Sequence, residues 1–579
     1  MQFFVCWPSG AQLGVVTISM ASLGKDLVRA ASGFTAPGVV RLFCGMQPVQ
    51  DDVPLIAQQL QGATLTVIVL PIDDLDRLRN AEAVLDGKRP IDWWQIWDQT
   101  SELRTNRVPV VGLPSGLREL TLRNFNSSLE DVTWPPGLQE LSLGSRFNQS
   151  LEQVSLPMSL RYLYLGSQFN HALDRSLPAG LVELEFSYAS AFNQSLDNMS
   201  WPAGLRRLTF GNLFNQNLDN ARLPDALERL TLSTRFNQSL DNVNLPSGLC
   251  ALILGHCFQQ SLHRVTWPSG LQLLKLQHFD SKGLLIDLPS SLRSLALGHG
   301  FDSLHKVTLP SSLQYVNVGV SVILQGLPAG LRHLEFGQVF NQSLENVTLP
   351  SGLMQLTFGT LFNQAIRSHH LPSGLQQLTF GVEFDQSLDT MVFPMGLRIL
   401  RFGDCWNQSL EAVNFPSSLQ ELVFGHNFNQ YLQGVTFPSS LQRLVLGGSF
   451  NASLENVTLP GGLQQLTLSD RFNRALQNVC IPSGLQQLTF GRWFNQTLEN
   501  VNLPKALQQL TFGRDFNQPL ERVIFPSGLQ KLTLGIRFAH SLVDVKMPSL
   551  ELVLPFINSH DALVEVPMCH VRVKRQRLQ

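Results

Sequence analysis

The sequence predicts a mostly β, elongated solenoid of about 20 coils of 22 residues, preceded by a small α+β domain. Two observations predict this fold class. A short motif recurs through most of the 579 residues, and the chain is rich in residues that interrupt helices, with 32 Pro and 43 Gly. Because only 15% of the residues are charged whereas 44% are hydrophobic, the chain is too apolar to be disordered. Its length therefore measures the number of coils.

Residues 1–74 lie outside the repeat and predict a separate domain. The pattern of apolar residues predicts, in order, a hairpin, a helix and two further strands, at residues 3–5 with 12–18, 23–31, 40–43 and 65–70. This β-β-α-β-β order, with M-Q-F-F-V at its start, V-R-L-F-C-G in its middle and A-T-L-T-V-I-V-L near its end, resembles ubiquitin-like (β-grasp) domains.

The resemblance implies a possible docking patch for ubiquitin-pathway proteins. Phe43 and Ile68 match two positions of the family's apolar patch, whereas Pro8 replaces a third. The chain has Asp73 and Asp74 where the conjugated members of the family end in Gly-Gly, and it continues from there. A fixed domain that is not conjugated is therefore implied. The alternative is that these apolar residues are exposed singly and have no partner.

Residues 75–112 predict a helical linker and an N-terminal cap. Leucines recur at helical spacing until Gly87 ends the pattern. Trp93, Trp94 and Trp97 then precede the first repeat. An unprotected first coil would expose its apolar end, so we interpret these tryptophans as a cap, with a docking surface as the alternative.

A proline-led unit recurs over residues 113–555. From Pro328 onward the prolines follow one another at intervals of 22 residues. In the unit that begins at Pro482, the alternation places Leu488 and Phe490 on one side of a short strand and Gln487 and Thr489 on the other. The following glycine ends the strand. No later stretch of the unit is long or periodic enough for a helix, so the return path is predicted to be extended or looped.

One phenylalanine and the residue after it recur in nearly every coil. The phenylalanine, which Trp406 replaces once, predicts a buried aromatic spine running from Phe125 to Phe538. The next residue is usually Asn and sometimes Asp, as at Asp385. Because an amide side chain both donates and accepts hydrogen bonds, these residues predict an asparagine ladder between adjacent coils.

The unit F-N-Q-S-L-E-N-V-x-L-P-S-G-L-Q-x-L-T-F-G resembles the FNIP repeat, a short variant of the leucine-rich repeat. The resemblance covers about residues 113–555. It implies a solenoid that binds other proteins, and it implies no chemistry. Residues 556–579 lose the pattern and are predicted to form a C-terminal cap and a basic tail, for which a nuclear signal is the alternative.

Charge and targeting signals narrow the classes of partner. A net charge of −2 provides no broad basic field, which argues against nucleic-acid and membrane binding. The N-terminus lacks the pattern of a secretory signal, and no apolar run is long enough to span a membrane. Seven cysteines without a C-x-x-C pair predict free thiols. We therefore expect a cytoplasmic protein, with the nucleus as the alternative.

No catalytic, cofactor or metal motif occurs, so we predict no enzyme activity, no cofactor and no metal site. The irregular coils between residues 246 and 328 are the one place that raises the question. His256, His278 and His299 each lie ten residues after a repeat proline, so they would align on successive coils. Solvated turn histidines, a local partner site and a transition-metal site are the alternatives for this trio.

The outward face of the strands is the better candidate for partner binding. Late coils repeat Gln-x-Thr, whereas earlier coils carry charged and aromatic residues, which interface hot spots favour. We predict Tyr162, Tyr164 and Glu185 as partner-binding residues. The sequence thus predicts a non-enzymatic scaffold or adaptor that binds a protein on its strand face. The alternative is a structural solenoid whose Gln/Thr ladder binds a repetitive ligand such as glycan or ice.

Overall fold

The structure is a computed structural model that describes residues 113–555, except residues 174–176, 198, 279–285, 300–306, 320–325 and 346. Beyond that span it describes the backbone of seven strands, at residues 2–6, 12–17, 38–44, 47–48, 65–71, 102–105 and 571–576. The chain divides into two compact units, Met1–Leu271 and Gln272–Gln579, which we take in turn.

The first unit begins with five short strands. They are β1 (Gln2–Cys6), β2 (Gln12–Thr17), β3 (Gly38–Cys44), β4 (Gln47–Pro48) and β5 (Leu65–Pro71). β1 pairs antiparallel with β2, and β3 pairs antiparallel with both β4 and β5. The four strands predicted in this segment are therefore confirmed. The predicted helix at residues 23–31, and with it the ubiquitin-like arrangement, lies outside the described residues.

The remaining strands of the first unit form one parallel ladder. Strand follows strand in register from β6 to β13, and each strand begins one coil after the one before. The strands are β6 (Glu102–Thr105), β7 (Glu119–Leu122), β8 (Glu140–Leu143), β9 (Tyr162–Leu165), β10 (Glu183–Phe186), β11 (Arg207–Thr209), β12 (Arg229–Thr231) and β13 (Ala251–Leu254).

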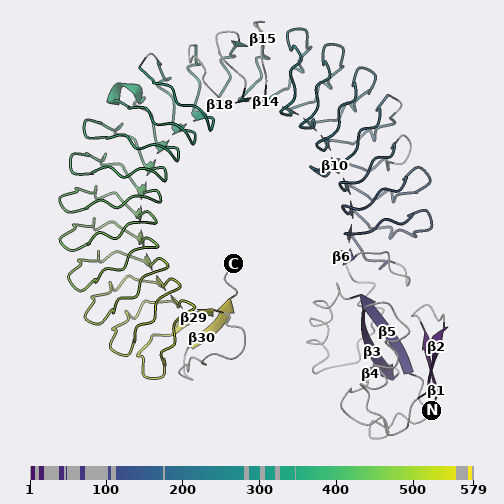
Figure 1. Cartoon of the computed structure of the whole chain (residues 1–579). Helices are drawn as coiled ribbons and strands as arrows, with labels where there is room; N and C mark the ends of the chain where they lie inside the picture. The colour runs from purple at the N-terminus through teal and green to yellow at the C-terminus, as the bar shows by residue number, and fades with distance from the viewer. Residues whose placement is uncertain are drawn as a thin grey trace. The chain divides into compact units, whose positions relative to one another are not determined.

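The second unit repeats this arrangement. Its main ladder consists of β14 (Leu273–His278), β16 (Ser294–His299), β18 (Tyr315–Val318), β19 (His333–Phe336), β20 (Gln355–Thr357), β21 (Gln377–Thr379), β22 (Ile399–Arg401), β23 (Glu421–Val423), β24 (Arg443–Val445), β25 (Gln465–Thr467), β26 (Gln487–Thr489), β27 (Gln509–Thr511), β28 (Lys531–Thr533), β29 (Leu550–Pro555) and β30 (Val571–Gln576). A second parallel pair, β15 (Ile286–Asp287) and β17 (Val307–Thr308), lies in the irregular coils. In each unit the strands line the concave edge and the turns line the convex edge (Figure 1).

Two turns shape each coil. In the unit that begins at Pro482, the Leu485 amide donates to the Pro482 carbonyl at 3.1 Å, which closes the turn before the strand. After the strand, the Phe494 amide donates to the Gly491 carbonyl at 3.5 Å. The proline and the glycine therefore mark the two ends of the strand, as the repeat predicts.

The aromatic spine is confirmed wherever the structure describes it. Phe362 is fully buried, and its ring centroid lies 5.9 Å from that of Phe340 and 6.1 Å from that of Phe384, with nearly parallel planes. A second aromatic column at the end of the strands supports the first, since the Phe358 ring lies 4.0 Å from that of Phe362. Stacked rings at these distances add about 0.5–1.5 kcal/mol per pair beyond the burial of their surface.

The asparagine ladder is also confirmed. The Asn429 amide donates to Asn407 Oδ1 at 2.9 Å, and Gln430 Nε2 donates to the same oxygen at 3.0 Å. Asp385 replaces Asn without breaking the ladder, because its Oδ1 accepts from the Asn407 amide at 2.9 Å. Each coil thus satisfies a turn amide of the next one.

The described return paths are extended or looped, as predicted, with one exception. Residues Ser368–His370 form a short 3-10 helix, η3, in the second unit. The linker helix and the tryptophan cap predicted within residues 75–112 lie outside the described residues, as does the predicted cap over residues 556–570. At the ends of the ladder, the backbone of β6 pairs with β7 and that of β30 pairs with β29.

Candidate functional site

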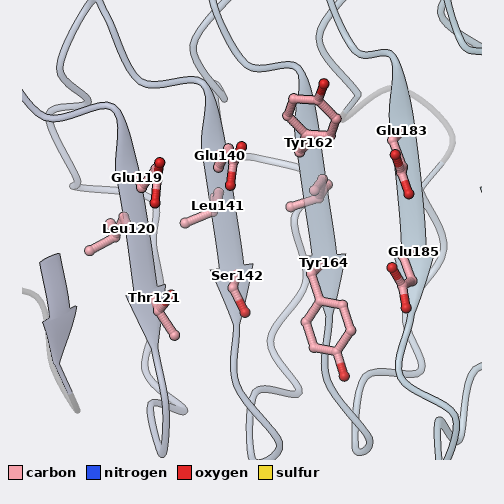
Figure 2. Close-up of a pocket in the computed structure, with 11 residues that line it drawn as sticks. Glu119, Leu120, Thr121, Glu140, Leu141, Ser142, Tyr162, Tyr164, Glu183 and Glu185 are labelled. Carbon is pink, nitrogen blue, oxygen red and sulfur yellow. The ribbon is translucent and has the colours of Figure 1, made fainter. Parts of the chain in front are cut away.

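The outward face of the first unit's ladder carries a concentration of carboxylates and tyrosines. Along each strand the second and fourth residues are buried leucines or phenylalanines, so the first and third residues point away from the core. Tyr162 therefore lies between Glu140 and Glu183 in the register, and Tyr164 lies between Ser142 and Glu185 (Figure 2).

These side chains line a shallow hollow of about 250 Å³ over β7 to β10. Its floor is formed by the backbone and the buried leucines Leu120, Leu141 and Leu163. Its walls are polar side chains: Glu119, Thr121, Glu140, Ser142, Tyr162, Tyr164, Glu183 and Glu185. We call this set the acidic hollow. Tyr162 remains 41% exposed, so its ring is available to a ligand that enters the hollow.

The carboxylates of the acidic hollow repel one another. Burial raises the pKa of Glu140, and the negative charges of Glu119 and Glu183 raise it further. Burial likewise raises the pKa of Glu185, with Glu183 as the second cause. At one edge of the hollow, Arg207 Nη1 lies 3.0 Å from Glu183 Oε2 and offsets part of this charge. A cationic ligand would relieve the remaining repulsion.

We expect Glu140→Gln to raise the melting temperature at pH 7, by roughly 1 °C. A carboxyl whose pKa is higher in the folded than in the unfolded chain destabilises the fold when it is ionised. As the pH falls through this raised pKa, the folded protein takes up the proton first, so the advantage of the variant should shrink. Thermal denaturation between pH 4 and pH 8 measures this. The exposed Glu411→Gln serves as a control, and a gain that does not change with pH would contradict the prediction.

The structure brings together three of the five predicted partner-binding residues, Tyr162, Tyr164 and Glu185. The sequence analysis did not include Glu119, Glu140 and Glu183 in this set, although the 21- to 24-residue spacing already aligned them with Tyr162. Phe43 and Ile68 lie in β3 and β5, where Phe43 pairs with Thr66 and Ile68 with Arg41. The two are thus diagonal neighbours in the backbone ladder. Their side chains lie outside the described residues.

Other aligned residues form columns on the second unit. Gln465, Gln487 and Gln509 pair directly on adjacent strands, as do the threonines two positions later, so the predicted Gln/Thr ladder is confirmed in its register. His278 and His299 also pair directly, although their side chains lie outside the described residues.

One group of described side chains in the second unit has the composition of a metal site. Glu345, His369 and His370 lie together on neighbouring return paths. Among the cysteines that the structure describes, Cys250, Cys257, Cys405 and Cys480 are free thiols. No helix in the described part of the chain is long and apolar enough to cross a membrane.

Comparisons with known proteins agree with the repeat. A family model described as FNIP Repeat matches residues 147–189, 192–235, 214–257, 322–361, 362–405, 406–449, 450–492 and 494–536. Among solved structures, the chain is similar to CroV588, described as a novel circular LRR protein. The identity is 33% and the TM-score 0.63, over 84% of this chain and 77% of that one. YopM from Yersinia enterocolitica WA-314 is 20% identical with a TM-score of 0.41, over 86% of this chain and 99% of that one. No curated protein matches the chain.

Proposed function

The chain belongs to the FNIP repeat family, and from this premise we propose that it is a non-enzymatic scaffold that binds a protein partner on the strand face of its first unit. Solenoids of this kind offer an extended concave surface for binding. The observation that carries the proposal is the acidic hollow, in which four glutamates and two tyrosines lie on four adjacent strands.

The chemistry of the acidic hollow favours a partner that presents lysine or arginine side chains. Like charges raise the pKa of Glu140, so a cation placed between Glu140 and Glu183 would gain energy from both carboxylates. Tyr162 and Tyr164 flank the same position and can contact a cation through the faces of their rings. Tyrosine and charged residues around a leucine floor are also the composition that binding hot spots favour.

Binding of defined peptides to the full-length protein tests this proposal. A basic peptide should bind more tightly than acidic or neutral peptides, and its affinity should fall as the salt concentration rises. The triple variant Tyr162→Ala, Tyr164→Ala, Glu185→Ala should abolish binding and leave the melting temperature unchanged. The matched control changes outward residues of the second unit, Gln355→Ala, Gln377→Ala and Thr379→Ala. Equal loss in both triple variants would contradict the assignment of the site.

For the N-terminal domain, we propose a docking role toward ubiquitin-pathway proteins through Phe43 and Ile68. Its support is the sequence resemblance together with the antiparallel strands β1 to β5. Such a role requires the cytoplasm or the nucleus, and free thiols suit these reducing compartments. Full-length protein should enrich proteasome, ligase or chaperone components, and the double variant Phe43→Ala, Ile68→Ala should not. Enrichment by neither protein would contradict this role and leave the acidic hollow unaffected.

The alternative function, binding of a repetitive glycan or of ice, has one observation in its favour. The outward Gln and Thr residues of β25 to β27 repeat in direct register. If this ladder is the binding surface, Thr467→Val and Thr489→Val should abolish adsorption to ice or to a polysaccharide. The acidic-hollow variants should have no effect on that adsorption.

A further inference from the structure

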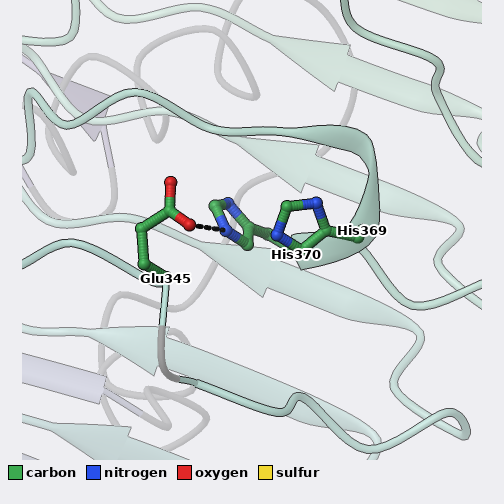
Figure 3. A group of neighbouring side chains, drawn as sticks. All are labelled: Glu345, His369 and His370. Carbon is green, nitrogen blue, oxygen red and sulfur yellow. Dashed lines mark ion pairs between the residues drawn. The ribbon is translucent and has the colours of Figure 1, made fainter.

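Three side chains of the second unit converge on the return path of the coil that begins at Phe362. They are Glu345, His369 and His370, and one candidate ligand atom of each lies within 4.8 Å of the others. His369 and His370 come from η3, and Glu345 comes from the preceding coil (Figure 3). Glu345 and His369 are exposed, whereas His370 is only 2% exposed.

The burial of His370 departs from the neighbouring repeat. In the next coil, the residue 22 positions after His369 is Met391, which is 3% exposed, and the residue 22 positions after His370 is Val392, which is 69% exposed. The 3-10 turn reverses this order and turns a histidine inward. Burial lowers the pKa of His370, and the neighbouring His369 lowers it further, so the ring is neutral at pH 7 and can act as a ligand.

The Nε2 atom of His370 is buried and has no hydrogen-bond partner. Its neighbour is Glu345 Oε2 at 3.8 Å, which is too long for a hydrogen bond. Leaving a buried polar group unpaired costs about 1–3 kcal/mol. A metal ion bound to both atoms at about 2.0–2.2 Å would span such a gap with little movement of the carboxylate.

We propose that Glu345, His369 and His370 bind a zinc ion. Two imidazole nitrogens and one carboxylate oxygen form a ligand set that Zn²⁺ accepts, and a fourth position remains for water. His370 supplies the fixed ligand, because its ring is packed in the core. Glu345 and His369 are exposed and can close onto the ion from the solvent side.

Two groups around the cluster oppose the ion, and they make the proposal specific. The Arg367 amide donates to His370 Nδ1 at 3.1 Å, so the proton of the neutral ring is on Nε2. Zinc binding at Nε2 transfers that proton to Nδ1 through solvent and breaks the hydrogen bond from the amide, while the ring stays neutral. The Arg367 side chain also competes for the carboxylate, since its Nε lies 3.5 Å from Glu345 Oε1.

The test is metal titration of the full-length protein, with Zn²⁺ followed by calorimetry and Co²⁺ followed by the visible absorption of a four-coordinate ion. One site should be lost, or weakened at least about tenfold, in His369→Ala and in Glu345→Gln. Both residues are exposed, so circular dichroism should show an intact fold. His333→Ala, which removes a histidine from the strand face of the same unit, should bind as the wild type does.

Two further variants have effects of opposite sign. Arg367→Gln removes the competing guanidinium and should raise the affinity for zinc severalfold. His370→Val should abolish binding while raising the melting temperature, because it replaces an unpaired buried polar group by an apolar one. In the wild type, zinc should speed hydrogen exchange at the Arg367 amide. The proposal fails if no stoichiometric zinc binding occurs, if His369→Ala and Glu345→Gln bind zinc as well as the wild type, or if Arg367→Gln leaves the affinity unchanged.

Discussion

Phe362→Ala should lower the free energy of unfolding of the second unit by about 3–5 kcal/mol. Phe362 is fully buried, and its ring is enclosed by those of Phe340, Phe358 and Phe384 at centroid distances of 5.9, 4.0 and 6.1 Å. Truncation removes these contacts and leaves a cavity that the rigid ladders on either side cannot close. In a solenoid each coil contacts only its neighbours, so the loss also uncouples the coils before Phe362 from those after it.

Denaturant unfolding combined with hydrogen exchange measures this effect. Exchange should accelerate first in the coils on either side of Phe362, and the unfolding transition should broaden or divide. Leu361→Ala is the matched control, because Leu361 precedes Phe362 in the same turn and is 44% exposed. The prediction is wrong if both variants lose the same small amount of stability.

Gly403→Ala should destabilise the same unit by about 1–3 kcal/mol through overpacking. A Cβ atom at Gly403 would overlap the backbone carbonyl of Gly381 in the preceding coil. The same relation links Gly425 to Gly403 and Gly447 to Gly425, so the turn after the strand has a column of close backbone contacts. Because the obstacle is backbone and not a flexible side chain, relief requires the coils to separate.

The control for this substitution is another glycine of the same unit. An added Cβ at Gly461 meets nothing within 4 Å. Gly461→Ala should therefore leave the stability unchanged or slightly raised. Thermal denaturation of the two variants side by side tests the difference. Equal melting temperatures would show that the glycine column adjusts to a methyl group without strain.

The period of the sequence predicted most of the solenoid, since it fixed which residues meet on adjacent coils. Leu488 and Phe490 were expected on the buried side of a strand, and both are buried. Tyr162, Tyr164 and Glu185 were expected on the outward face because of their parity in the strand, and the structure gathers them in one hollow. The shift in the pKa of Glu140 could not be predicted in this way, because it depends on how far the strand face is desolvated.

The same period failed at the cluster of Glu345, His369 and His370. By register His369 should be buried like Met391 and His370 exposed like Val392, whereas the structure shows the opposite order. The cause is η3, which tightens the backbone by one local turn and rotates the two side chains. Sequence reasoning had no signal for this turn. The paired histidines in place of the usual Val-x dipeptide were the only hint of a site there.

The asparagine ladder makes the number of coils a variable that evolution can change in whole steps. Each Asn side chain accepts from the backbone amide one coil further on, as Asn407 does from Asn429, so any two complete coils offer matching ends. Removal or duplication of 22 residues by recombination would restore every column at once. A change of 21 residues would turn the leucines of the following strand toward solvent. Unequal crossing-over can therefore lengthen or shorten this protein without redesigning its core.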